Sequence, residues 1–398
     1  MIELVYGHDS NASGPLRIAI LAGIRSPWAI AIANSLAEGG HVVTFISLEV
    51  AGQRFAEAHK TIACEGARRL RRGGVNLVWA GPHSNVAAEV LRLAIMLRRV
   101  RRRDGFDICV CLYGGVLATA AFLSGVRPYA VYWMGSDIHQ LRGWLKSRLF
   151  RAIGCNANLN FANGYSLAAL GRNQMGVPCV MPLYHGIDCD QYNVGTGRVA
   201  GPSVKIIVLR SFEAIYDNAT IVRAFAAALT KSQGHRIEFG AHGSLLNQAR
   251  ELWAAICPEG QEDAAAFRGG YGQSELLQML REGDVYVSMS YADGTSTSLL
   301  EAMAAGLYPI LSDIPANREW FVTHGCIGKL VPVGDANALE QALVTAMSAP
   351  YLRERAAAHN AAIVRRLADS KTSRDVLVAA LRRVVLERHQ IADRKKRL

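Results

Sequence analysis

Hydrophobic and polar positions along the first fifty residues alternate in a pattern typical of a strand, a helix and a second strand. The apolar run from Arg17 to Ala22 predicts a buried strand. Apolar residues then recur at helical spacing from Trp28 to Leu36, Gly39 and Gly40 end the predicted helix, and a second strand follows from Val42 to Ile46. This order is typical of a doubly wound parallel sheet.

The same pattern continues, with one interruption near the middle of the chain. Further strands are predicted at Val75 to Trp79, Asp107 to Leu112, Tyr129 to Met134 and Val204 to Leu209. Residues 191–202 are rich in Gly and weakly patterned, which is typical of a linker. We therefore expect an α/β protein with a first domain at 1–190, a second at 203–370 and a last helix at 371–398 that returns to the first domain.

One strand, loop and helix carry the strongest candidate chemistry. Val285, Val287 and Met289 alternate as in a buried strand, a polar loop follows, and a helix is predicted up to Gly306. The loop and first helical turn are small residues, and amides at a helix start suit a phosphate or diphosphate; these residues are Gly294, Thr295, Ser296, Thr297 and Ser298. Asp293 and Glu301 flank that spot as hydrogen-bond acceptors for sugar hydroxyls.

This stretch, DGTSTSLLEAMAAG, resembles the donor-site signature of the retaining nucleotide-sugar glycosyltransferases of family 4 (glycosyl transferases group 1). The resemblance implies the GT-B fold, with two Rossmann-like domains facing across a cleft. It also implies that Asp293 holds the donor sugar and Glu301 the ribose. Asp293 stands where the family usually has Glu, which bears on the identity of the sugar.

The resemblance extends through the second domain, with one lost cation. Arg210 matches the family's arginine on the donor diphosphate, whereas Tyr216 falls where a lysine is usual. Tyr271 occupies the place where these enzymes hold the nucleotide base, and Gly243 ends a Gly-rich strand that allows close approach of a ligand. Together with the loop residues above, these are the predicted catalytic and donor-binding residues.

The resemblance is weaker in the first domain, where an acceptor would bind. Gly23 and Arg25 follow the first strand, and Arg25 is either a cleft residue or an exposed loop arginine. Met134 replaces a usual histidine, which leaves Asp137 and His139 as candidates for acceptor contact; His139 is alternatively a surface residue. The segment from His185 to Asp188 resembles the family's Asn-Gly-Ile-Asp junction.

Positive charge is concentrated in the first half of the chain. Residues 1–200 carry 21 Lys+Arg and 12 Asp+Glu, whereas the remainder carries 23 and 21. Two segments, 67–74 and 90–105, are Arg-rich, and the second places six Arg beside apolar residues. Such helices suit an anionic membrane surface or plain solvation. No aromatic pattern typical of nucleic-acid binding accompanies them.

The sequence thus predicts an enzyme that transfers a hexose-type sugar from a nucleotide sugar to a hydroxyl acceptor, with retention and without a cofactor or metal. A lipid-linked saccharide at the membrane is the favoured acceptor, and a soluble small molecule is the alternative. A nucleotide-sugar epimerase and a non-catalytic nucleotide-sugar-binding protein remain rival hypotheses. The N-terminus lacks the pattern of a signal peptide, which predicts a cytoplasmic location.

Overall fold

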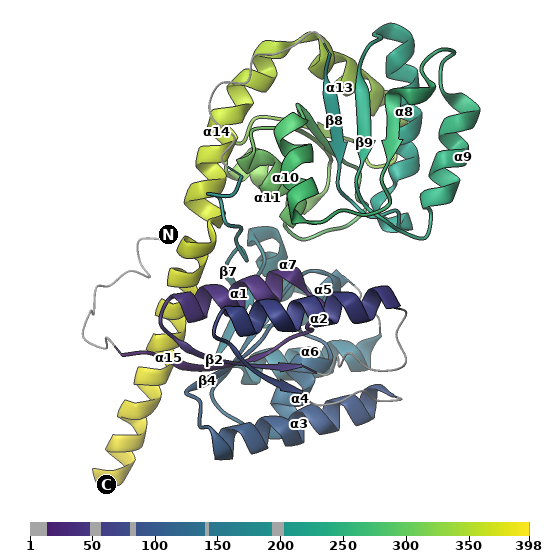
Figure 1. Cartoon of the computed structure of the whole chain (residues 1–398). Helices are drawn as coiled ribbons and strands as arrows, with labels where there is room; N and C mark the ends of the chain where they lie inside the picture. The colour runs from purple at the N-terminus through teal and green to yellow at the C-terminus, as the bar shows by residue number, and fades with distance from the viewer. Residues whose placement is uncertain (1–13, 48–56, 80–84, 140–142, 193–202, 398) are drawn as a thin grey trace. The chain divides into compact units, whose positions relative to one another are not determined.

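The computed structural model describes residues 14–47, 57–79, 85–139, 143–192 and 203–397, and these residues form two compact units (Figure 1). Unit 1 comprises residues 1–163, 167–185 and 374–398, and unit 2 comprises residues 164–166 and 186–373. The predicted boundaries lay at 190 and 370. Each unit is a parallel sheet with helices on both faces, as the sequence predicted.

Unit 1 is built on a seven-stranded sheet of order β3-β2-β1-β4-β5-β6-β7. Its strands are β1 (Arg17–Leu21), β2 (Val42–Ser47), β3 (Asn76–Trp79), β4 (Ile108–Cys111), β5 (Tyr129–Trp133), β6 (Leu159–Ala162) and β7 (Met181–Pro182). Its helices are α1 (Pro27–Glu38), α2 (Glu57–Arg72), α3 (Val86–Arg103), α4 (Val116–Ser124), α5 (Ser136–His139), α6 (Trp144–Asn156) and α7 (Tyr165–Met175). The predicted strands are therefore confirmed to within a residue or two.

Two hydrophobic cores lie on opposite faces of this sheet. One contains residues of α1, α2 and the last helix, and the other contains residues of α3, α4, α6 and α7. The two Arg-rich segments lie on α2 and α3, so they belong to opposite faces of the sheet. A flat partner that covers one of these two helices therefore cannot cover the other at the same time.

Unit 2 is built on a six-stranded sheet of order β10-β9-β8-β11-β12-β13. Its strands are β8 (Lys205–Val208), β9 (Arg236–Phe239), β10 (Ala265–Phe267), β11 (Val285–Ser288), β12 (Tyr308–Ser312) and β13 (Lys329–Val331). Its helices are α8 (Asn218–Lys231), α9 (Leu246–Ile256), α10 (Gln273–Glu282), α11 (Thr297–Ala304), α12 (Pro315–Arg318), α13 (Ala336–Ser348) and α14 (Pro350–Ala368), with short turns η2 (Ala214–Tyr216), η3 (Glu262–Ala264) and η4 (Glu319–Thr323).

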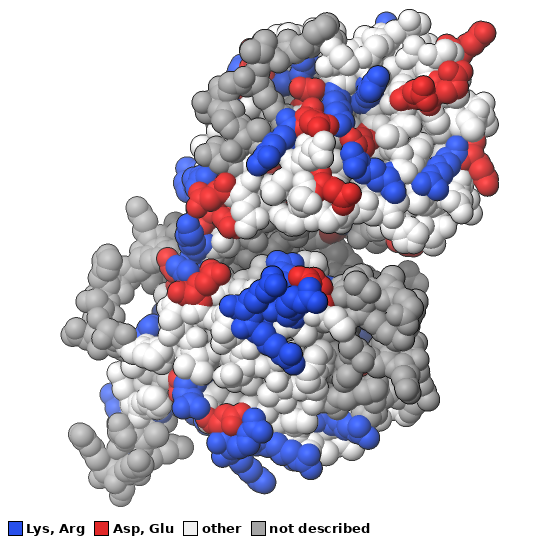
Figure 2. Space-filling model, viewed as in Figure 1, with Lys and Arg blue, Asp and Glu red and all other residues white. Residues whose placement is uncertain are grey.

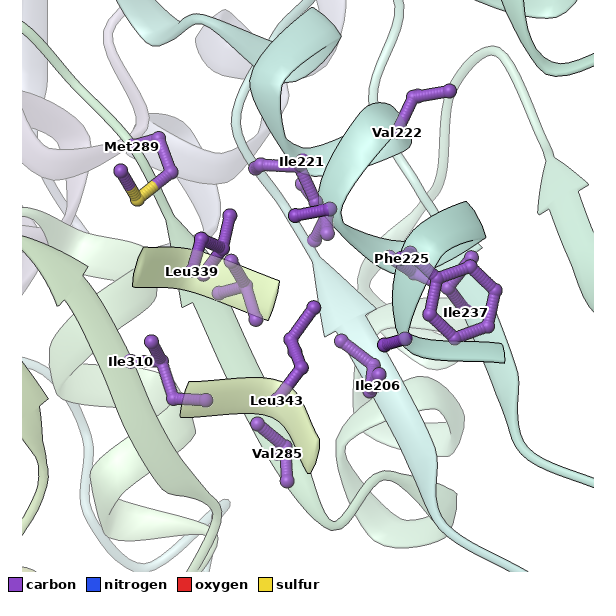
Figure 3. Close-up of a cluster of buried hydrophobic side chains, with 14 of the residues drawn as sticks. Ile206, Ile221, Val222, Phe225, Ile237, Val285, Met289, Ile310, Leu339 and Leu343 are labelled. Atoms are coloured by element: carbon purple, nitrogen blue, oxygen red, sulfur yellow. The ribbon is translucent and has the colours of Figure 1, made fainter. Parts of the chain in front are cut away.

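Branched aliphatic side chains from β8, β9, β11 and β12 pack in one core with residues of α8 and α13 (Figure 3). Ile206, Val285 and Ile310 are fully buried, and Phe225 and Leu343 cover them from the two helices. Such continuous apolar strands are typical of a parallel sheet that is buried on both faces. This core holds β8 and β11 side by side and so positions the loops that follow them.

Apart from the short segment 164–166, the chain passes from unit 1 to unit 2 after residue 185 and back after residue 373, and backbone hydrogen bonds join the residues next to these two crossings. The N–H of Ile187 donates to the carbonyl of Ala368 at 2.9 Å, and the N–H of Ser370 donates to the carbonyl of Ile187 at 2.7 Å. Gly186 has φ of 79°, and a Cβ there would lie 2.9 Å from the Cα of Ser370. The predicted junction segment is therefore paired with the start of the last helix, α15 (Ser370–Arg397).

Helix α15 then contributes an apolar face to unit 1. Leu377, Leu381 and Val385 are buried in the same core as α1 and the central strands of that unit. Unit 1 is thus completed by residues from the far end of the sequence.

Candidate functional site

The strand order of unit 2 reverses between β8 and β11, and ligands of doubly wound sheets bind outside the carboxyl ends of strands at such a reversal. Arg210 follows β8, whereas Asp293 and Ser296 follow β11. Because β8 and β11 are parallel neighbours, these residues meet at one edge of the sheet. The N–H of Tyr291 donates to the carbonyl of Ile215 at 2.9 Å, which ties the two loops together.

Arg210 is the centre of this cluster. Its Nη2 lies 2.7 Å from Oδ2 of Asp293, and its Nη1 donates to Oγ of Ser296 at 2.7 Å. Its guanidinium lies 4.0 Å from the ring centroid of Tyr216, a distance typical of a cation–π contact. The side chain is only 14% exposed. Arg210 is therefore a largely buried cation whose orientation is set from three sides.

The start of α11 lies at the same place. Ser296 precedes the helix in an extended conformation, so the amides of the first turn form the positive end of the helix. The hydroxyl of Ser298 hydrogen bonds to Oγ of Ser296 at 2.9 Å and to the phenol of Tyr286 at 2.8 Å. The side chains of Ser296 and Ser298 thus join a buried network, which leaves backbone amides as the groups suited to an anion.

Glu301 lies one turn further along α11, on the same side of the helix as Thr297. The phenol of Tyr192 donates to Oε1 of Glu301 at 2.9 Å, and Nε2 of Gln273 donates to the same phenol at 3.3 Å. Burial raises the pKa of Glu301 to about 7, although the bond from Tyr192 acts against this rise. The carboxyl is therefore poised to change its charge near neutral pH.

Tyr192 and Gln273 were not found from the sequence. Tyr192 lies at the edge of the predicted linker, and nothing in the local pattern connects it with a glutamate in a distant helix. Gln273 opens α10, two residues after the predicted Tyr271. Only the folded chain brings these two side chains to Glu301.

Gly243 and Tyr271 lie close to the Arg210 cluster, and both contact neighbouring backbone of the chain itself. A Cβ on Gly243 would lie 2.4 Å from the backbone nitrogen of Phe212, so glycine is required for packing at this position. The phenol of Tyr271 donates to the carbonyl of Leu209 at 3.4 Å, directly before Arg210. Their predicted contact with a nucleotide therefore remains a prediction.

In unit 1 the strand order reverses between β1 and β4. Gly23 and Arg25 follow β1, so they lie at the position where a ligand of this unit is expected. Tyr113, which follows β4, has φ of 148°, a value almost confined to glycine. Strain of this kind at the edge where a ligand is expected marks Tyr113 as a further candidate for a ligand-binding residue. Local sequence patterns do not reveal it.

Asp137 has a structural role that the sequence did not reveal. It is 3% exposed, and its carboxylate accepts hydrogen bonds from the N–H groups of Gly114, Met134, Gly135 and Ile138 at 2.8–3.2 Å. Both oxygens are thus engaged in holding two loops. We therefore do not retain Asp137 as an acceptor-binding residue. His139 ends α5, and its side chain lies outside the described residues.

In the described part of the chain, no three His, Cys, Asp or Glu side chains converge in a way that suits a metal ion. No described helix is both long enough and apolar enough to cross a bilayer.

The architecture matches solved GT-B structures over nearly the whole chain. A glycosyltransferase from Rickettsia africae superimposes with a TM-score of 0.76 at 13% identity, covering 94% of this chain and 99% of that one. The Anabaena protein HepE in complex with UDP superimposes with a TM-score of 0.72 at 15% identity, covering 92% and 99%. The chain has the GT-B fold.

Sequence comparison identifies the unit 2 domain more closely. Residues 205–349, which lie within unit 2, match the model of the glycosyl transferases group 1 family. A GDP-mannose:cellobiosyl-diphosphopolyprenol alpha-mannosyltransferase of Xanthomonas campestris is 29% identical over 133 residues, 33% of this chain. A phosphatidyl-myo-inositol mannosyltransferase of Mycobacterium leprae is 41% identical over 101 residues, 25% of this chain. The matches span 34% and 27% of these relatives.

Proposed function

We propose that the protein is a retaining glycosyltransferase that moves a hexose-type sugar from a nucleoside-diphosphate donor to a hydroxyl acceptor. The observation that supports this most directly is the cluster of Arg210, Asp293 and Ser296 at the start of α11. A cation, a helix N-terminus and a carboxylate meet there within hydrogen-bond distance. This combination suits a diphosphate that is attached to a sugar.

In this proposal the protein acts mainly on the departing nucleoside diphosphate. The acceptor oxygen bonds to the anomeric carbon while the bond from that carbon to the donor phosphate breaks. Arg210 with the α11 amides stabilises the negative charge that grows on the departing diphosphate. Asp293 accepts hydrogen bonds from sugar hydroxyls, and Glu301 accepts them from the ribose. The leaving phosphate takes the proton of the acceptor hydroxyl, so that no separate protein base is required.

We further propose that the donor charge is neutralised without a resident divalent ion, because Arg210 and the helix amides already supply positive potential. A transfer assay with and without a chelator tests this point. Unchanged turnover in the chelator is expected, and a loss that Mg²⁺ or Mn²⁺ restores would contradict it.

For the acceptor we propose a lipid-linked saccharide at the cytoplasmic face of an anionic membrane. The two mannosyltransferases reported above carry lipid acceptors in their names, and exposed arginines lie along α3 in unit 1. The same relatives favour mannose as the sugar. A soluble acceptor remains the alternative that a transfer assay must test.

Donor binding is the decisive experiment. We expect one sugar nucleotide among GDP-mannose, UDP-glucose and related compounds to raise the melting temperature, because a ligand at about one hundred times its Kd adds about 2.7 kcal/mol to the free energy of unfolding. Arg210→Ala should abolish the shift, whereas Arg236→Ala, at an exposed arginine of the same unit, should keep it. Absence of a shift with every sugar nucleotide would contradict the proposal.

Transfer itself is then measured with the donor that binds. Labelled sugar should move to a lipid extract or a polyprenyl-diphosphate saccharide, and NMR of the product reports the anomeric configuration. Turnover of the donor without any acceptor would favour an epimerase. Binding without turnover in any lipid extract would favour a non-catalytic protein.

A further inference from the structure

Helix α6 of unit 1 begins with two large apolar side chains that the fold leaves in solvent. Trp144 is 67% exposed and Leu145 is 66% exposed. Leu149, one turn further on, is 38% exposed, whereas Phe150 and Ile153 point into the core. Single exposed apolar residues are ordinary, but an adjacent Trp and Leu at the start of a helix form a small apolar surface that the unit itself does not cover.

Cations surround this apolar surface. The guanidinium of Arg148 lies 5.8 Å from the ring centroid of Trp144, and Lys146 and Arg151 are exposed on the same helix. The sequence contains no Asp or Glu from Ile138 to Ile187. The start of α6 therefore combines an aromatic residue, a leucine and positive charge without acidic neighbours in the chain.

The surface continues across α4 to α3, because α4 packs against both helices. Leu91 and Ile95 of α3 are 61% and 38% exposed. Arg98 reaches from α3 to the last turn of α4, where its Nε donates to the carbonyl of Ser124 at 2.5 Å. Exposed arginines line the outer side of α3; they are Arg92, Arg98, Arg99, Arg102 and Arg103 (Figure 2). Helices α3, α4 and α6 thus present one basic surface with apolar residues at two places.

The start of α6 also lies at the edge of the sheet that is formed by the carboxyl ends of the strands. In a parallel sheet the helix after a strand begins at that strand's carboxyl end, so Trp144 and Leu145 belong to the edge that carries Gly23 and Arg25. Any acceptor bound by unit 1 is expected at this edge. An anchor there would bring the carboxyl edge of the unit to the surface from which a lipid-linked acceptor extends.

We propose that the outer surface of α3, α4 and α6 docks on an anionic lipid bilayer, with Trp144 and Leu145 inserted at the interface. The inference rests on the proposed lipid-linked acceptor and names the residues that reach the lipid. Tryptophan is enriched where membranes meet water, and arginines near an anionic surface attract it over a Debye length. Basic residues outnumber acids on these helices, where Glu89 is the one acid within α3 and Asp104, which follows α3, pairs with Arg103. Such a surface complements a uniformly anionic membrane better than the mixed charges of a typical protein partner.

The test is co-sedimentation of the full chain with vesicles of phosphatidylcholine alone or with phosphatidylglycerol. The wild-type protein should pellet with the anionic vesicles at low salt and be partly released at high salt. Trp144→Ser with Leu145→Ser should lower the partition coefficient about tenfold or more. Arg99→Gln with Arg102→Gln should lower it by a similar factor and weaken its salt dependence. Both pairs are exposed, so the fold is expected to remain intact.

Matched controls lie in unit 2. Val322→Ser changes an apolar side chain that is 77% exposed, and Arg236→Gln changes an exposed arginine; neither should alter vesicle binding. Vesicle binding that is unaffected by the Trp144 and Leu145 pair would overturn the proposed anchor. Equal binding to neutral and anionic vesicles would overturn the electrostatic part, and a lack of vesicle binding by the wild type would reject the membrane as partner.

Separate measurements of donor binding and vesicle binding distinguish this inference from the proposed function. Donor binding is measured by thermal shift and depends on unit 2. A wild-type protein that binds a sugar nucleotide but no vesicle would refute the docking surface alone. A protein that binds vesicles through Trp144 but no sugar nucleotide would refute the proposed function and leave the membrane surface standing.

Discussion

Arg210 and Asp293 form an ion pair with 2.7 Å between Nη2 and Oδ2, and each comes from a loop at the carboxyl end of a different strand. In this pair, the carboxylate that is predicted to hold the sugar directly contacts the cation that is predicted to hold the diphosphate. A donor diphosphate must therefore share Arg210 with Asp293 or displace it. Since Asp293 is shorter than the usual Glu by one methylene, its reach from Arg210 toward a sugar is correspondingly limited.

We expect Asp293→Glu to change the choice of donor more than it changes stability. The longer side chain moves the carboxylate by about one methylene, and a loop tolerates the added volume. Relative kcat/KM values across several sugar nucleotides measure the effect, with the melting temperature as control. Identical relative values for all donors would remove Asp293 from the sugar pocket.

Tyr216 should act through its ring and not through its hydroxyl. Its ring centroid lies 4.0 Å from the guanidinium carbon of Arg210, and a largely desolvated cation–π contact contributes about 2 kcal/mol. Tyr216→Phe should therefore keep kcat/KM within about twofold, because the ring remains. Tyr216→Ala should lower kcat/KM by about tenfold or more. If the Phe variant were as impaired as the Ala variant, the hydroxyl would be the functional group.

Glu301→Gln should lower the rate of sugar transfer by about a hundredfold, because a charge-assisted contact to the donor ribose is lost. Initial rates of transfer for the variant and the wild type measure the effect.

Glu301→Gln should also change how the free energy of unfolding depends on pH. Burial raises the pKa of Glu301 from 4.5 to about 7, so in this window the native state keeps a proton that the unfolded chain has released. The contribution of Glu301 is therefore present below about pH 4.5 and is lost as pH rises to about 7.

The free energy of unfolding should fall by about 3 kcal/mol as this contribution of Glu301 is lost. Denaturant unfolding of the wild type and of Glu301→Gln at pH 5 and pH 8 measures it, with Glu354→Gln at an exposed position as the control. The Glu301 variant should lose less stability than the wild type between the two values. Parallel pH profiles for both proteins would show that Glu301 titrates normally.

Leu381→Ala should destabilise unit 1 by about 2–5 kcal/mol, because it opens a cavity in a fully buried position of α15. Leu386→Ala on the same helix, at a position 40% exposed, is the matched control and should cost much less. Hydrogen exchange resolved by peptide measures the change, and the effect should appear in β1 and α1. Equal protection in both variants would mean that α15 does not support this core.

The sequence by itself determined the elements and the class of fold. Apolar alternation, helical spacing and glycine stops are local properties, so the predicted strands and α11 agree with the structure to within a residue or two. The string from Asp293 to Gly306 is one strand end, loop and helix. Its resemblance to the glycosyl transferases group 1 family was therefore visible in a single short window and is confirmed by the match over residues 205–349.

The tertiary structure decided which residues work together. The ion pair of Arg210 with Asp293 depends on β8 and β11 being neighbours, and the bond of Tyr192 to Glu301 joins residues far apart in the chain. Asp137 resembled a site residue in its local motif, but folding placed four backbone N–H groups around its carboxylate. The order of strands in a sheet is set by long-range packing of side chains from distant segments, and no local periodicity encodes it.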